Sequence, residues 1–156
     1  MTISLEPGSK APNFDLPTNG EGRARLKDYA EQSLILYFYP KDDTSGCTKQ
    51  AIAFTQYQDK LNAAGIQILG VSKDSPKSHD KFVAKHSLGI TLASDESLEM
   101  CQAYGVWVEK KLYGRTYMGI ERSTFLIGPD GKIKNIWRKV KVAKHMGELL
   151  DTLNLG

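Results

Sequence analysis

The sequence contains few cysteines and no long apolar segment. Its 156 residues include two cysteines, Cys47 and Cys101, too few for the disulfide framework of a small secreted domain. The longest strongly apolar run covers residues 34–38, whereas a transmembrane helix needs roughly 20 apolar residues, and the first ten residues have no apolar signal-peptide core. We therefore expect a cytoplasmic protein with no membrane partner, in which each cysteine serves either packing or chemistry.

The chain also has little net charge. It has 21 Lys and Arg residues against 18 Asp and Glu residues, a formal net charge of +3, so the composition does not favour a nucleic-acid partner. With 40% hydrophobic residues, we expect one core and a single domain over residues 1–156. The histidines His79, His86 and His145 lack the spacing of metal ligands. We therefore expect no metal site and place these histidines at the surface or at helix caps.

Segments with the period of strands alternate along the chain with segments of helical period. Residues 7–28 are rich in Gly and Pro, which predicts loops with one short hairpin. A Gly-Pro-Asp-Gly turn at residues 128–131 predicts a late hairpin. The expected strands are 34–39, 66–71, 123–127 and 133–137, and the expected helices are 47–64, 75–86, 96–104 and 143–153. This order predicts an α/β fold with a mixed central sheet and helices on both faces.

The polar segment before Cys47 places this cysteine in the first turn of a helix, directly after a central strand. Unpaired backbone N–H groups and the helix dipole favour an anion at that position, and therefore a thiolate. Holding an ordinary thiol ionised near pH 6 takes about 3.4 kcal/mol, whereas the dipole supplies about 0.3–1 kcal/mol. A cation must therefore lie close to Cys47. The neighbouring Asp42 and Asp43 are expected to shape the turn rather than to act as an acid/base pair.

The pattern Pro40-x-x-x-Thr44-x-x-Cys47 resembles the active-site loop of the peroxiredoxins. The wider context, in residues 37–44 and 119–127, looks like the bacterioferritin comigratory protein (PrxQ) branch of that family, and the resemblance spans nearly the whole chain. It implies a thioredoxin-like fold and thiol-dependent reduction of hydrogen peroxide and organic hydroperoxides in antioxidant defence. It also implies a monomer without cofactor, recycled by thioredoxin, glutaredoxin or glutathione.

The resemblance also assigns roles to individual residues. Cys47 would be the peroxidatic cysteine, Thr44 would hydrogen-bond the peroxide, and Pro40 would shield the thiolate. Arg122 would be the cation that the thiolate requires. Together with the backbone N–H groups of Gly46 and Cys47, Arg122 would stabilise the charge that develops on the leaving oxygen.

The sequence departs from the branch at several positions. Ser45 stands where many members have Pro, and Gln50 stands where many have Glu. The second, resolving cysteine of the branch often lies five residues after the first or in the following helix. Here those positions hold Ile52 and, approximately, Val83.

Cys101 is the one remaining candidate for a resolving cysteine. It shares an apolar helical face with Leu98 and Tyr104, and an unpaired cysteine there behaves as a small buried hydrophobe. Packing is the favoured role, and a resolving role stays open. Because Cys101 is expected in a different helix from Cys47, we predict a one-cysteine cycle that uses an external thiol.

Two other functions compete with the peroxidase. A thioredoxin-like dithiol oxidoreductase is disfavoured because the sequence has no Cys-x-x-Cys motif. A binding or holdase module that keeps the fold would show no turnover of peroxide, so a peroxide-consumption assay distinguishes it from the enzyme.

Overall fold

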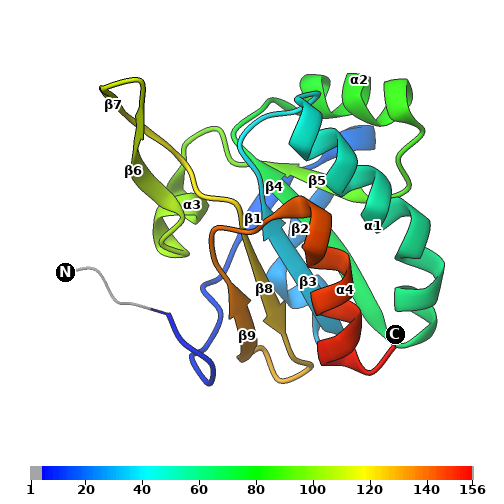
Figure 1. The fold of residues 1–156 in the computed structure, drawn as a ribbon. Coiled ribbons are helices and arrows are strands. Elements are labelled where there is room, and N and C mark those ends of the chain that lie inside the picture. The colour runs from blue at the N-terminus through cyan, green and yellow to red at the C-terminus, as the bar shows by residue number, and fades with distance from the viewer. Residues whose placement is uncertain (1–4, 156) are drawn as a thin grey trace.

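A five-stranded mixed sheet forms the centre of the computed structural model, which describes residues 5–155 (Figure 1). The strand order is β5-β4-β3-β8-β9. The central strand β3 pairs in parallel with β4 and antiparallel with β8. The strands are β3 (Ser33–Phe38), β4 (Ile66–Ser72), β5 (Thr91–Ser94), β8 (Ser123–Ile127) and β9 (Ile133–Trp137). The expected mixed sheet is therefore confirmed.

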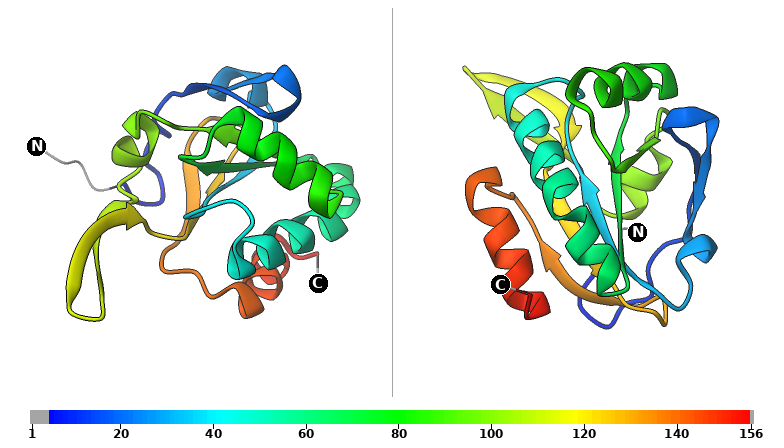
Figure 2. Two further views of the ribbon diagram at one scale, coloured as in Figure 1. Left: turned by 90° about the horizontal axis from the view of Figure 1, so that it is seen from above. Right: turned by 90° about the vertical axis from the view of Figure 1, so that its right-hand side faces the viewer.

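Helices cover both faces of this sheet, as expected (Figure 2). They are α1 (Ser45–Ala63), α2 (Pro76–His86), α3 (Glu99–Ala103) and α4 (Val142–Leu153). Helices α1 and α4 lie on one face, and α3 lies on the other beside the N-terminal strands (Figure 2). Gly65, with a φ of 78°, follows α1 and allows the chain to turn into β4.

The alternation of side chains along β3 divides the core into two clusters. Leu34, Leu36 and Phe38 belong to the cluster on the α3 side. Ile35 and Tyr37 belong to the cluster on the α1 side. All five side chains are buried, which explains the continuous apolar run of this strand. Side chains of the α3-side cluster are therefore separated by the sheet from side chains of the α1-side cluster.

The hairpin expected near the N-terminus is present, and a second one was not expected. Strands β1 (Asp15–Pro17) and β2 (Arg23–Arg25) pair antiparallel around the short 3-10 helix η1 (Asn19–Glu21), and a second 3-10 helix, η2 (Leu26–Tyr29), follows. Strands β6 (Trp107–Leu112) and β7 (Arg115–Ile120) form a separate two-stranded sheet that projects from the body (Figure 1). Strand β5 was also not expected.

Two other expectations are wrong. Helix α3 begins at Glu99 rather than Glu96, because Leu98 adopts a left-handed backbone with a φ of 66°. His79 and His145 are buried instead of lying at the surface or at caps, because both ring nitrogens of His79 and Nε2 of His145 find hydrogen-bond partners inside the protein. Only His86 is partly exposed.

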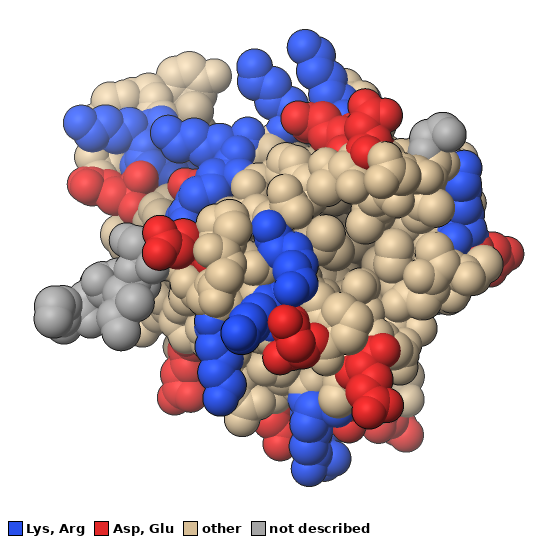
Figure 3. Space-filling view, turned by 90° about the horizontal axis from the view of Figure 1, so that it is seen from below, with Lys and Arg blue, Asp and Glu red and all other residues tan. Residues whose placement is uncertain are grey.

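The surface combines both signs of charge. Basic and acidic side chains are interspersed over the face shown in Figure 3. Within residues 5–155, no helix is long and apolar enough to cross a bilayer. The same residues contain no group of three or more His, Cys, Asp or Glu side chains that could hold a metal ion.

Candidate active site

The C-terminal end of β3 and the start of α1 position Cys47. The Tyr39 amide still pairs with the Val71 carbonyl at 3.0 Å, after which residues 40–44 form the loop that leads into α1. Asp43 in this loop has a left-handed φ of 59°, a conformation that is strained for a residue other than glycine. Cys47 is the third residue of α1 and is 2% exposed. Its sulfur therefore sits where first-turn amide groups have no helical acceptor.

Arg122 approaches Cys47 from the adjacent strand. It immediately precedes β8, whose first residue, Ser123, pairs with Phe38 at the end of β3. Its Nη2 donates to Sγ of Cys47 at 3.4 Å. A Cβ atom on Gly46 would lie 3.2 Å from the same Nη2, so the glycine leaves room for the guanidinium. The cation that the sequence required beside Cys47 is therefore present in the geometry.

Gln50 fixes the orientation of the guanidinium. Its Oε1 accepts a hydrogen bond from Nη1 of Arg122 at 2.6 Å. An arginine only donates, so the oxygen of this amide faces Arg122 and its nitrogen points away. That nitrogen is buried without a partner among the described residues. A neutral side chain thus orients Arg122 without neutralising its charge.

The ring of Tyr37 forms one wall beside the sulfur. It stacks on Phe54 with centroids 4.5 Å apart, and Gly70 on β4 leaves the space that its ring occupies, because a Cβ there would lie 2.8 Å from Tyr37 Cζ. Burial, followed by the charges of Cys47 and Asp42, raises the pKa of Tyr37 well above its ordinary value. Its hydroxyl therefore stays protonated.

Lys110 on β6 is a second cation near the site, and the sequence analysis missed it. Burial and then the charge of Arg122 lower the pKa of Lys110, while Glu121 and Cys47 raise it. Its side chain also lies against Gly119 of β7. The hairpin that carries Lys110 was not expected from the sequence, so no signal there could have placed this residue.

Pro40 and Thr44 lie in the loop that leads into α1. The Thr44 hydroxyl donates to the Lys41 carbonyl at 2.9 Å, so its proton is engaged within the loop, and the residue itself is exposed. Pro40 is half-buried directly after Tyr39. The structure thus brings Cys47 and Arg122 into contact and leaves Thr44 and Pro40 in the neighbouring loop.

Cys101 lies on the other side of the sheet. It packs in the cluster with Leu34 and Phe38, whereas Cys47 packs in the cluster with Tyr37. Its side chain is buried and its amide donates to Oδ2 of Asp95 at 2.7 Å. Burial, assisted by Asp95, raises the pKa of the Cys101 thiol. Both cysteines are free thiols.

Sequence comparison relates the chain to one family. The AhpC/TSA family profile matches residues 7–136. A putative peroxiredoxin bcp of Coxiella burnetii is 48% identical over 151 residues, which cover 97% of this chain and 100% of that protein. Peroxiredoxin Bcp of Bacillus subtilis is 43% identical over 151 residues, which cover 97% of this chain and 96% of that protein.

Comparison with solved structures gives the same relatives. A mutant of Xylella fastidiosa PrxQ has a TM-score of 0.92 at 40% identity, over 97% of each chain. The bacterioferritin comigratory protein of Xanthomonas campestris, solved in a study of its alkyl peroxide reduction activity, has a TM-score of 0.87 at 40% identity, over 99% of this chain and 98% of that one. These neighbours confirm the expected thioredoxin-like fold.

Proposed function

The chain belongs to the AhpC/TSA family and, within it, to the Bcp/PrxQ peroxiredoxins, and on this basis we propose that Cys47 is its reacting thiol. As a peroxiredoxin, the protein is a thiol-dependent peroxidase. The single observation that carries the assignment of Cys47 is its 3.4 Å contact with the guanidinium of Arg122 at the start of α1. The other cysteine, Cys101, has the carboxylate of Asp95 beside it rather than a guanidinium.

In the first step the Cys47 thiolate attacks the terminal oxygen of the hydroperoxide. An S–O bond forms as the O–O bond breaks, so that the attacked oxygen stays on sulfur as a sulfenic acid. The other oxygen leaves as alkoxide, or as hydroxide from hydrogen peroxide, and takes a proton from water. Arg122 and the amide groups of Gly46 and Cys47 stabilise this developing negative charge. Pro40 and Thr44 limit access and orient the peroxide from the loop.

In the second step an external thiol restores Cys47. The thiol attacks the sulfenic sulfur, releases water and forms a mixed disulfide, which a second thiol reduces. Thioredoxin, glutaredoxin or glutathione supplies these thiols. The placement of Cys101 across the sheet supports a cycle in which Cys47 alone undergoes chemistry.

The substrates are hydrogen peroxide and organic hydroperoxides. Alkyl peroxide reduction by the Xanthomonas campestris relative, 40% identical over nearly the whole chain, supports the organic class. Two free thiols suit a reducing compartment, and this supports a cytoplasmic location. The enzyme acts as a monomer, which analytical ultracentrifugation of the reduced protein tests directly.

The assignment is tested by replacing the proposed nucleophile. Cys47→Ser should abolish peroxide consumption with any thiol donor, because a serine hydroxyl is not ionised at neutral pH. Cys101→Ser is the matched control, since it removes a buried thiol on the far face of the sheet. Circular dichroism verifies that both variants fold. Turnover by Cys47→Ser above a trace would refute the assignment.

A further inference from the structure

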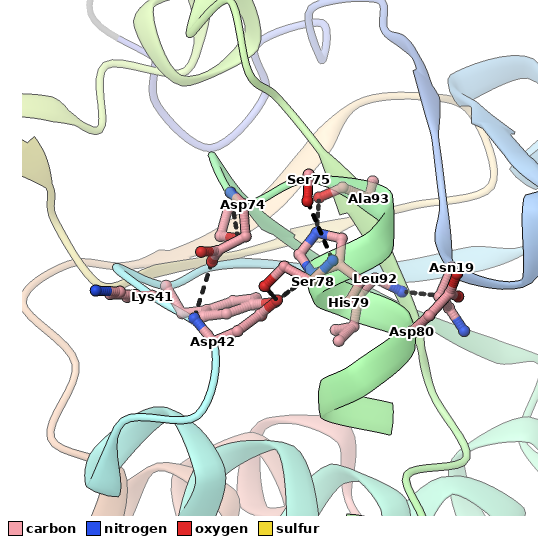
Figure 4. A network of polar contacts seen from close by, with 12 residues as sticks. Asn19, Lys41, Asp42, Asp74, Ser75, Ser78, His79, Asp80, Leu92 and Ala93 are labelled. Atoms are coloured by element: carbon pink, nitrogen blue, oxygen red, sulfur yellow. Dashed lines mark hydrogen bonds and ion pairs between the residues drawn. The ribbon is translucent and has the colours of Figure 1, made fainter. Parts of the chain in front are cut away.

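A buried Asp–His pair lies beside the site and has no part in the chemistry described above. Nδ1 of His79, on α2, is 2.7 Å from Oδ2 of Asp42, in the loop that precedes Cys47. The His79 side chain is 0% exposed and that of Asp42 is 4% exposed. Figure 4 shows the two residues facing each other between the loop and α2. The two residues are 37 positions apart in the sequence, so no local sequence pattern predicts the pair.

Both ring nitrogens of His79 face acceptors. Nε2 lies 3.0 Å from the carbonyl oxygen of Ala93 on β5, which can only accept, and Nδ1 faces the carboxylate of Asp42. His79 therefore joins the loop, α2 and β5 through two buried hydrogen bonds.

Asp42 is held by further donors. Tyr39 OH donates to Oδ1 at 2.5 Å, and Ser78 Oγ donates to Oδ2 at 2.8 Å. Burial raises the pKa of Tyr39 well above its ordinary value, so this hydroxyl keeps the proton that it donates. The Asp42 amide in turn donates to the carboxylate of Asp74 at 2.8 Å, after β4 (Figure 4). Every polar atom of the Asp42 side chain is thus engaged.

These contacts fix the backbone immediately ahead of the reacting thiol. The next residue, Asp43, has a strained left-handed backbone, and Thr44 then caps α1 with Cys47 at its third position. A strained conformation persists only where its surroundings determine it. The backbone of Asp43 is held from both ends. On its N-terminal side, Asp42 is fixed by its hydrogen bonds, and on its C-terminal side the first turn of α1 begins.

Building on the proposed role of Cys47, we propose that His79 is a positioning residue that acts on the peroxide reaction through Asp42. A buried polar pair adds little net stability compared with apolar packing, so stability alone does not explain its place here. Its effect is to hold the loop in the one geometry that aligns the first turn of α1 with Arg122. Misplacing reacting groups by about 1 Å costs up to about a hundredfold in rate.

Two amide substitutions separate positioning from general packing. In His79→Asn the amide nitrogen takes the place of Nδ1 and keeps a donor to Asp42, whereas in His79→Gln it takes the place of Nε2 and keeps only the donor to Ala93. We expect His79→Gln to lower the second-order rate constant for Cys47 oxidation by hydrogen peroxide about tenfold or more, and His79→Asn to stay within about threefold of the wild type. The reduced protein is mixed with peroxide without a thiol donor, and remaining thiols are counted.

A second Asp–His pair provides the matched control. Nε2 of His86, also on α2, is 2.8 Å from Oδ1 of Asp43 in the same loop, but this pair is partly exposed. Exposed pairs contribute little to stability, so His86→Gln should leave the rate constant within about twofold of the wild type. A fall in His86→Gln equal to that in His79→Gln would overturn the proposal.

The remaining outcomes are also decisive. Equal rates for folded His79→Gln and wild type, with only a lower unfolding temperature, would assign His79 a merely structural role.

If the His79 variants do not fold, Ser78→Ala removes one donor from Asp42 at a half-buried site, and an unchanged rate constant there refutes the proposal. A wild type without Cys47-dependent turnover would instead refute the proposed function.

Discussion

Arg122 donates to the sulfur of Cys47 from one guanidinium nitrogen and to Gln50 from the other. The 3.4 Å contact with Sγ places a positive charge directly against the thiol, and Lys110 is a second cation that interacts with both groups. The charge beside Cys47 therefore comes from two segments that are separated in sequence, strand β6 and the residue that immediately precedes β8.

Replacement of Arg122 by Met should slow Cys47 oxidation by peroxide about a hundredfold or more, because a donor to the developing oxyanion is lost. The midpoint of the alkylation profile of Cys47 should also move to higher pH, since the nearest cation is gone. Stopped-flow oxidation and iodoacetamide alkylation across pH measure the two effects. Arg138→Met, which removes an exposed arginine paired with Glu121, is the control. An unchanged alkylation profile would assign the charge to Lys110 or Lys41.

Replacement of Gln50 by Glu introduces a carboxylate where Oε1 now accepts from Arg122 at 2.6 Å. The new charge partly offsets the guanidinium, so the thiolate of Cys47 loses stabilisation and its alkylation midpoint should rise. We expect peroxide reduction to slow by about threefold, far less than on loss of the arginine itself. Faster oxidation in Gln50→Glu would show that the amide, rather than the charge of Arg122, limits the reaction.

The acid stability of the protein should depend on His145. Its Nε2 lies 2.7 Å from Thr124 Oγ1, and burial, which outweighs the charge of Glu148, lowers its pKa from 6.5. Below pH 6.5 the unfolded state then binds more protons than the folded state, so the free energy of unfolding falls as pH falls through this range. In His145→Gln the decline between about pH 7.5 and 5.5 should be shallower. Urea titrations at several pH values measure it, and parallel pH curves for the two proteins would contradict the prediction.

Most of the sheet and its covering helices could be predicted from the sequence, because continuous apolar runs such as residues 34–38 fit only buried strands. The β6–β7 hairpin could not. Its side chains are largely exposed, including Tyr113 at 96% and Tyr117 at 46%, and its two strands pair only with each other. Because neither face of the hairpin is buried, its sequence lacks the alternation of apolar and polar residues that predicts a strand. Lys110, which lies on this hairpin, was therefore missed.

The contact between Arg122 and Cys47 was expected from a family resemblance, whereas the environment of the histidines was not. Periodicity shows which face of a helix is apolar, and His79 was expected at the surface or at a helix cap because the histidines lack the spacing of metal ligands. Its partners Asp42 and Ala93 belong to distant segments that come together only in the folded chain. The Thr44 hydroxyl bonds to Lys41, a local preference that the motif did not reveal.

Oxidised Cys47 should be recycled by an external thiol and not by Cys101. A disulfide requires two Cα atoms within about 7 Å, and Cys101 is buried on the opposite side of β3. Reaching Cys47 would require local unfolding across the sheet, and the raised pKa of the Cys101 thiol makes it a poor nucleophile. One equivalent of peroxide without reductant should therefore consume one thiol, and excess peroxide should over-oxidise Cys47 to sulfinic acid. Thiol counting and mass spectrometry of peptides measure both. A linked Cys47–Cys101 peptide in quantitative yield, or loss of thioredoxin-supported turnover in Cys101→Ser, would establish Cys101 as the resolving cysteine.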